Sequence, residues 1–281
     1  MEIASTVAEL RSWSRSLRCA PGHSIGLVPT MGAFHAGHAS LIRAARAACS
    51  HVAVSLFVNP TQFGPSEDFS RYPRSFDADC ALAEREGVDL LFTPAVEEMY
   101  PEGAATFVEV EGLGQRLDGA SRPGHFRGVA TVVAKLLIAA EPDFAFFGQK
   151  DAAQVAVLRQ LARDLRLDVE IVVCAIVREP DGLALSSRNA YLTAAERRQA
   201  LALSRAVGTV EALVAGGERR ADLLITAARD VLAAEPAIRI DYVEMVDWAR
   251  LEPVAVAAPG TLFAVAAWVG GTRLIDNAIL K

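Results

Sequence analysis

The chain has 281 residues, of which 52% are hydrophobic and 22% are charged, a balance typical of a globular protein and not of a disordered one. A chain of this length forms one large domain or two modest ones and can fold without disulfides or a structural metal. The formal net charge of −6 argues against a broad nucleic-acid-binding face, although a local basic pocket for a small anion remains compatible with it.

Four cysteines are widely spaced along the chain: Cys19, Cys49, Cys80 and Cys174. They contain no CxxC pair, so the sequence predicts neither a disulfide framework nor a zinc site. We interpret them as buried thiols of a protein in the reducing cytoplasm. The N-terminal residues lack the pattern of a secretory signal, which agrees with that location.

One uncharged segment, residues 253–272, is long enough to span a bilayer. Pro253 and the pair Pro259-Gly260 interrupt it, so we expect two short buried strands around a turn, at 254–256 and 262–265. The sequence therefore predicts a soluble protein with a terminal hairpin.

Hydrophobic periodicity predicts alternating strands and helices over the first 177 residues. A capping box at Thr6 and Glu9 starts the first helix. Further helices are expected at 37–50, 76–85, 129–140 and 152–165, and strands at 25–28 (ending at Pro29), 52–58, 88–92, 106–110, 144–147 and 169–177. Such alternation predicts an α/β fold with a parallel sheet, helices on both faces, and ligands beyond the carboxyl ends of the strands.

The pattern changes beyond residue 176. Two helices at 194–214 and 221–234 precede a strand at 238–246 and the expected terminal hairpin. We therefore divide the chain into a domain of residues 1–176 and a smaller α+β domain of residues 177–281.

The turn after the first strand, residues 28–38, is the first candidate site. A strand-to-helix turn offers backbone N–H groups to an anion, and Gly32 and Gly37 allow a ligand to approach closely. His35 and His38 can lie on one face of the helix and neutralise negative charge. The structural alternative is that both histidines only cap the helix. Zinc is disfavoured, because no third ligand has suitable spacing.

Three further turns carry polar side chains. Asn59 and Gln62 follow the second strand and could read a carboxylate or hydroxyl, although an ordinary turn is the simpler interpretation. Lys150, Asp151 and Gln154 follow the strand at 144–147, where a surface lysine and a helix cap are the alternative. Residues 186–188, a Ser-Ser-Arg run after the turn at Asp181-Gly182, could clamp phosphate or could be loop decoration.

Six segments together carry a resemblance to a known family: VPTMGAFHAGH (28–38), LFVNPTQFGPSEDFSRYPR (56–74), SRPGHFRGVATVVAKL (121–136), FGQKDAAQ (147–154), VREPDGLALSSRNAYL (177–192) and AAWVGGTRLIDN (266–277). The chain resembles the pantoate–β-alanine ligase (pantothenate synthetase) family over nearly its whole length. The resemblance implies a Rossmann-like first domain, a C-terminal lid domain, a homodimer, and condensation of pantoate with β-alanine. In this family ATP is converted to AMP and pyrophosphate through a pantoyl adenylate, with Mg²⁺ as cofactor.

The resemblance also implies residue roles. His38 corresponds to the family's proton donor, and we expect His35, Lys150 and Arg188 to act with it. Gln62 and Gln154 correspond to the pantoate-binding glutamines, with Gln62 also near β-alanine. The expected ATP-binding residues are Met31, Gly32, Ala33, Phe34, His35, Ala36, Gly37, His38, Gly148, Gln149, Lys150, Asp151, Val177, Leu185, Ser186, Ser187 and Arg188.

No metal ligand is identified from the sequence, and Asp79 and Asp151 are only candidates for Mg²⁺. Departures from the family pattern are small: Phe34 replaces a usual Leu, and Ala153 replaces the first of a frequent Gln pair. Two other functions remain open: a related ligase or transferase for another acid, and a nucleotide-binding regulator without catalysis. An aminoacyl-tRNA synthetase is disfavoured, since the chain has no basic RNA-binding appendage.

Overall fold

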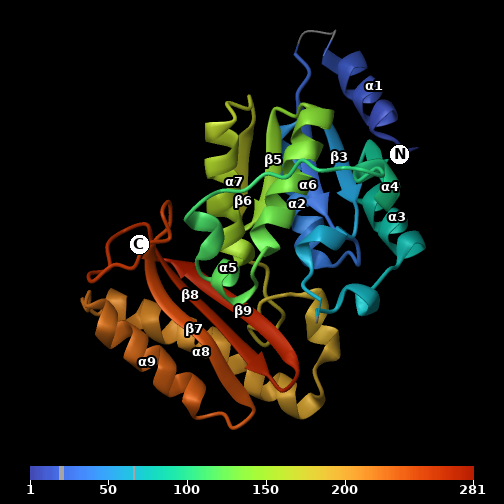
Figure 1. Cartoon of the computed structure of the whole chain (residues 1–281). Helices are drawn as coiled ribbons and strands as arrows, with labels where there is room; N and C mark the ends of the chain where they lie inside the picture. The colour runs from blue at the N-terminus through green and yellow to red at the C-terminus, as the bar shows by residue number, and fades with distance from the viewer. Residues whose placement is uncertain (19–21, 66) are drawn as a thin grey trace. The chain divides into compact units, whose positions relative to one another are not determined.

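The computed structural model describes residues 1–18, 22–65 and 67–281, which form two compact units (Figure 1). Residues Met1–Gly148 and Val157–Ala175 make up the first unit, and residues Gln149–Ala156 and Ile176–Lys281 make up the second. The short segment 149–156 therefore groups with the C-terminal part of the chain, although it lies within the first domain expected from the sequence.

The first unit is built on a six-stranded sheet in which all recorded strand pairs are parallel, as the alternating pattern predicts. The strand order is β1 (Glu2–Ala4), β4 (Leu90–Phe92), β3 (His51–Leu56), β2 (Ile25–Thr30), β5 (Phe144–Gly148) and β6 (Glu170–Cys174). Its helices are α1 (Val7–Arg18), α2 (Ala36–Ala48), α3 (Phe76–Arg85), α4 (Val96–Met99), α5 (Asp118–Ser121), α6 (His125–Ala140) and most of α7 (Ala152–Asp164).

Both faces of this sheet are buried. Val28 on β2 packs with Ile42 of α2 and Ala83 of α3 in one apolar cluster. The adjacent Leu27 points to the opposite face because side chains alternate along a strand, and it too is fully buried. The predicted parallel sheet with helices on both faces is thus confirmed.

Local signals in the sequence set several element ends. The Thr6–Glu9 capping box forms as predicted: Glu9 N–H donates to Thr6 Oγ1 (3.2 Å), and Thr6 N–H donates to Glu9 Oε2 (3.0 Å). The strand β2 runs two residues further than predicted, through Pro29. Proline is tolerated there because β5 pairs with β2 only at Gly26 and Leu27, so no N–H is required on that side.

Two strand predictions are wrong. Residues 106–110 form no strand; instead Val108 N–H donates to the Thr131 hydroxyl of α6 (2.9 Å). Residues 254–256 form no strand of the terminal hairpin and contribute one isolated bridge, between Val256 and Arg220. The strand β1 was not predicted at all.

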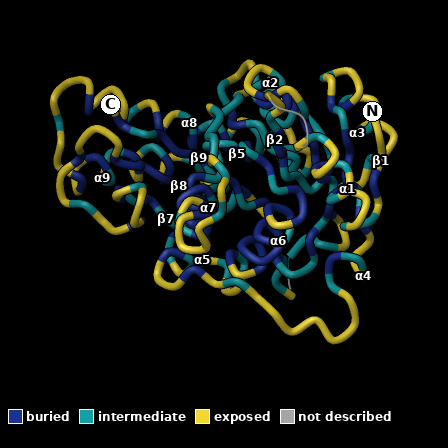
Figure 2. The backbone as a smooth tube through the Cα atoms, turned by 90° about the horizontal axis from the view of Figure 1, so that it is seen from above, coloured by how far each residue is buried: buried dark blue, intermediate teal, exposed yellow. Residues whose placement is uncertain are grey.

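The second unit contains α8 (Ala194–Ala215), α9 (Ala221–Ala233) and an antiparallel sheet of β7 (Ile238–Asp247), β8 (Thr261–Val269) and β9 (Thr272–Ile279). The central strand β8 is buried along almost its whole length, as Figure 2 shows in dark blue. Its core includes Leu203 and Val207 of α8 together with Phe263 and Val265. The predicted α+β character is confirmed, and the hairpin consists of β8 and β9.

In the described ranges, no helix combines the length and apolarity needed to cross a membrane. Cys49 is buried as predicted, whereas Cys80 and Cys174 are partly exposed; Cys19 lies outside the described residues. Burial raises the pKa of the Cys49 and Cys174 thiols, which favours their protonated form.

Candidate active site

The buried carboxylate of Asp79 stabilises the turn between β2 and α2. Asp79 of α3 accepts hydrogen bonds from the backbone N–H groups of Ala33 (2.9 Å) and Phe34 (2.7 Å), and from the Ser75 hydroxyl (3.1 Å). Gly32 and Ala33 both have positive φ, at 84° and 52°. A Cβ at Gly32 would meet Asp79 Oδ2 at 3.1 Å, so glycine fits both the backbone geometry and the space.

His35 and His38 form the start of α2 as a reciprocal cap. Gly37 N–H donates to His35 Nδ1 (3.1 Å), and His35 N–H donates to His38 Nδ1 (3.3 Å). The two rings lie 4.1 Å apart between centroids. The capping role anticipated as the structural alternative is therefore real.

This cap also fixes the protonation pattern of the two rings. Since each Nδ1 accepts a backbone N–H, each neutral imidazole carries its proton on Nε2. Each ring is then a hydrogen-bond donor at Nε2 without needing a positive charge. Capping and anion binding are consequently compatible, because they use different ring nitrogens.

The turn after β3 lies beside the turn after β2, since Thr30 and Leu56 are register partners at the strand ends. Asn59 is fully buried and internally bonded: its Nδ2 donates to Gln62 Oε1 (3.0 Å) and to Gly128 O (3.1 Å). Its Oδ1 accepts from the Tyr100 hydroxyl at 2.8 Å. Asn59 therefore shapes the turn.

Gln62 is the polar side chain of this turn that lies against the first site. Its Nε2 is 3.0 Å from Met31 Sδ, and 9% of the residue is exposed. The structure thus brings together Gln62 and Met31, which the sequence assigned to different substrates.

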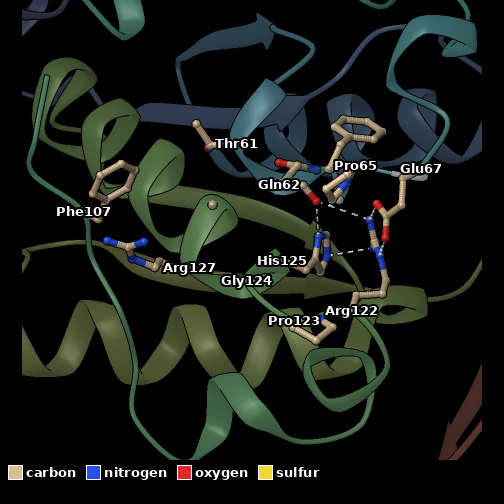
Figure 3. A pocket seen from close by; sticks show the side chains of 13 residues that line it. Thr61, Gln62, Pro65, Glu67, Phe107, Arg122, Pro123, Gly124, His125 and Arg127 are labelled. Carbon is tan, nitrogen blue, oxygen red and sulfur yellow. Dashed lines mark hydrogen bonds and ion pairs between the residues drawn. The ribbon is translucent and has the colours of Figure 1, made fainter. Parts of the chain in front are cut away.

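A cavity of about 200 Å³ adjoins the backbone of Gln62 (Figure 3). Charged and aromatic side chains line it: Glu67, Phe107, Arg122, His125 and Arg127. The Arg122 guanidinium binds both Glu67 oxygens, at 2.7 and 2.6 Å, and its Nη1 lies 3.0 Å from His125 Nε2.

His125 is oriented by this network. Arginine can only donate, so His125 Nε2 accepts from Arg122 and the ring proton is on Nδ1, which donates to the Gln62 carbonyl at 2.9 Å. Neither Arg122 nor His125 was assigned a role from the sequence, although both lie in the SRPGHFRGV motif that is part of the resemblance. The motif itself was found in the sequence, but its contact with the Gln62 carbonyl appears only in the folded structure.

Burial, followed by the positive charge of Arg122, lowers the pKa of His125 to about 4. In the unfolded chain a histidine titrates near 6.5. Between these values the unfolded state binds a proton that the folded state does not. The free energy of unfolding should therefore fall as the pH drops from 6.5 to 4, by up to about 3 kcal/mol.

We expect His125→Asn to remove this component, because asparagine keeps a donor for the Gln62 carbonyl but does not titrate. Urea unfolding of both proteins at pH 7 and pH 4.5 measures it. The wild type should lose more stability than the variant over this range. Equal losses would contradict the protonation state derived from the geometry.

In the second unit, the turn η4 (Gln149–Asp151) carries Lys150 and Asp151, whose charged groups pair at 3.2 Å. Gln154 follows on the first turn of α7. Asn277 of β9 donates to the carbonyls of both Gln149 (3.0 Å) and Lys150 (2.9 Å).

The segment 177–189 also belongs to the second unit and is held as a hairpin. Arg178 and Ala184 form an antiparallel bridge around Gly182, whose φ is 95°, as the Asp-Gly signal predicts. Leu185 N–H donates to Val177 O at 3.0 Å. Ser186 then caps the short helix η5 (Ser187–Tyr191) by accepting from Arg188 N–H.

The described residues contain no group of three or more His, Cys, Asp or Glu side chains that could hold a metal ion. The Asp79 carboxylate is committed to backbone N–H groups, and Asp151 is paired with Lys150. These residues do not fit a protein-built Mg²⁺ cage.

Comparison with known proteins identifies the family. The model of the Pantoate-beta-alanine ligase family matches residues 2–279. The chain belongs to this family. A "Pantothenate synthetase" of Acidobacterium capsulatum is 59% identical, with 100% of this chain and 97% of that protein covered, and one of Koribacter versatilis is 56% identical, with 100% and 96% covered.

Solved structures agree with this membership. The pantothenate synthetase of Thermus thermophilus superposes with a TM-score of 0.93 at 46% identity, covering 99% of each chain. The pantoate–β-alanine ligase of Francisella tularensis, described as complexed with "Beta-gamma ATP and Beta-alanine", has a TM-score of 0.81 at 33% identity, covering 99% of this chain and 97% of that one. The chain is accordingly a pantothenate-forming ligase.

Proposed function

We propose that the chain joins pantoate to β-alanine in two steps, with ATP as the activating co-substrate. An oxygen of the pantoate carboxylate attacks the α-phosphorus of ATP, the bond from that phosphorus to the α,β-bridging oxygen breaks, and pyrophosphate leaves. The amine of β-alanine then attacks the acyl carbon of pantoyl adenylate. The acyl C–O bond breaks, AMP leaves with the former pantoate oxygen, and the nitrogen releases a proton.

The chemistry of carboxylates requires such activation, because a carboxylate has no good leaving group for amide formation. The Francisella tularensis relative, described as complexed with "Beta-gamma ATP and Beta-alanine", supports the choice of co-substrates. The enzyme's contribution is then to position the reactants and stabilise developing charge.

Within the first unit, the Nε2 donors of His35 and His38 suit the phosphate oxygens of ATP, and Gln62 suits the polar groups of pantoate. The observation that carries this proposal is the contact between Gln62 Nε2 and Met31 Sδ (3.0 Å). The side chain expected to bind pantoate thereby contacts the turn expected to bind ATP. Residues 31–38 and Gly148 are the other residues of this unit that we expect to bind ATP.

Within the second unit, we propose that residues 149–151, Val177 and residues 185–188 bind ATP and that Gln154 binds pantoate. Lys150 and Arg188 supply positive charge for the phosphates. Mg²⁺ would have to bind chiefly through substrate oxygens, as this ion commonly does. From the family resemblance we also propose that the chain forms a homodimer and acts in the cytoplasm.

Oxygen transfer tests the two-step reaction. Pantoate labelled with ¹⁸O in its carboxylate should give AMP that carries one ¹⁸O atom per turnover, measured by mass spectrometry. Unlabelled AMP, or ADP as the nucleotide product, would exclude pantoyl adenylate as the intermediate.

The two glutamines should separate pantoate binding from ATP binding. Gln62→Ala and Gln154→Ala are expected to weaken pantoate binding at least tenfold and ATP binding less than threefold. Each substitution removes an amide expected to bind pantoate, so polar groups of the bound pantoate are left without a hydrogen-bond partner. Isothermal titration with each substrate gives both affinities. Gln160→Ala, at a half-buried position of α7 whose amide donates to Asp164, is the control and should change neither. Loss of ATP affinity with pantoate affinity retained would reverse the assignment.

A further inference from the structure

The dipeptide Asp276-Asn277 on β9 binds two separate segments of the second unit. Both residues are almost fully buried, at 2% and 4% exposure. Their side chains point to opposite faces of the strand, because successive residues of a strand alternate. Each face holds one segment to which the proposed function assigns ATP.

On one face, Asn277 fixes the turn that carries Lys150. Its Nδ2 donates to both Gln149 O (3.0 Å) and Lys150 O (2.9 Å), and its Oδ1 accepts from Gln149 Nε2 (3.2 Å). One side-chain amide thereby satisfies two successive carbonyls and the side chain of their first residue.

These bonds orient the two following peptide groups. In a trans peptide the C=O and N–H point in opposite directions. With the carbonyls of Gln149 and Lys150 turned toward Asn277, the N–H groups of Lys150 and Asp151 are turned away from it. The backbone N–H groups and the start of the Lys150 side chain are thus oriented together.

On the other face, Asp276 fixes the hairpin before residues 185–188. Arg178 donates to both carboxylate oxygens of Asp276, at 2.6 and 2.9 Å, and to Gly182 O at 3.1 Å. The hydrogen bond with Asp276 raises the pKa of Arg178, so the guanidinium stays protonated. This ion pair, buried on the Asp276 side and about one third exposed on the Arg178 side, has two parallel hydrogen bonds that restrict the geometry of the hairpin at this point.

We propose that Asp276 and Asn277 are positioning residues of the ligase reaction, with Asn277 directing the Lys150 side chain to the phosphates of ATP and Asp276 presenting residues 185–188. This inference rests on the proposed function, because it takes Lys150 as an ATP-binding residue. Neither side chain needs to touch a substrate.

Asn277→Asp is the sharpest test, because it keeps the shape and the acceptor oxygen but replaces the two donated hydrogen bonds by repulsion between oxygens. ATP affinity, measured by isothermal titration, is expected to fall at least tenfold, and pantoate affinity less than threefold. Asp241→Asn is the control: it removes the negative charge from the Arg273–Asp241 pair (2.8 Å) between β9 and β7, whose side chains are partly exposed. It should leave both affinities within twofold.

The same substitution in a Lys150→Ala background separates positioning from general destabilisation. If Asn277 acts through Lys150, Asn277→Asp should weaken ATP binding less than threefold when Lys150 is already removed. An unchanged ATP affinity in the single variant, a full tenfold effect in the double variant, or parallel losses for ATP and pantoate would each overturn the inference. If Lys150→Ala alone leaves ATP affinity unchanged, the ATP assignment of the proposed function fails, and the positioning role fails with it.

Discussion

Replacing His38 by alanine should lower the rate of pantoyl adenylate formation by about 10²–10³, the usual loss when one preorganised donor to transition-state charge is removed. The reason is the ring geometry at the start of α2. His38 Nδ1 accepts from His35 N–H, so its proton is on Nε2, where it can donate to a phosphate oxygen as negative charge develops. Single-turnover measurement of adenylate formation, without β-alanine and with enzyme in excess of ATP, gives this rate.

Two amide substitutions separate catalysis from capping at the same position. His38→Asn places an oxygen near the site of Nδ1 and keeps the cap, but it has no distal donor. His38→Gln places an N–H near the site of Nε2. We expect the asparagine variant to be as stable as the wild type and as slow as the alanine variant, and the glutamine variant to recover part of the rate. Wild-type rates in both the alanine and asparagine variants would leave His38 with the capping role alone.

Replacing Gly128 by alanine should abolish tight pantoate binding and destabilise the first unit by about 1–3 kcal/mol, the usual cost of overpacking. Gly128 lies in α6 against the turn after β3. An added Cβ would lie 2.3 Å from Thr61 O and 2.6 Å from Gln62 N, so the backbone that carries Gln62 has to move. Asn59, which donates to Gly128 O, would be displaced with it.

Pantoate titration and urea unfolding measure the two effects of Gly128→Ala. Gly208→Ala in α8 is the control, because a Cβ there meets nothing within 4 Å. It should be neutral or stabilise by up to about 1 kcal/mol. Normal pantoate affinity in Gly128→Ala would show that the position of this turn does not govern binding.

Local sequence signals were sufficient to predict those helix ends and turns that depend on residues close together in the chain. The capping box at Thr6 and the bounds of α3 (Phe76–Arg85) follow from residues within one or two turns of the helix. The strand-to-helix turn at residues 31–38 was likewise found from its glycines and its place after a buried strand. The family resemblance then supplied the roles of its residues, which pattern alone left open.

Long-range contacts were not accessible in the same way. The strand β1 is short and exists because it pairs with β4, far along the chain, with Glu2 opposite Leu90. The expected strand at 106–110 fails because its backbone finds the Thr131 side chain in place of a strand partner. The Arg122–His125 contact with Gln62 and the Asn277 contact with Gln149 join residues far apart in sequence, so they emerge only once the chain is folded.

Exchange of labelled pyrophosphate into ATP tests whether adenylation is a separate step, because it reports reversal of the first step alone. In the presence of Mg²⁺, exchange should require pantoate, should proceed without β-alanine, and should slow by about 10²–10³ in His38→Ala. Exchange that appears only when β-alanine is added would contradict a separate adenylation step.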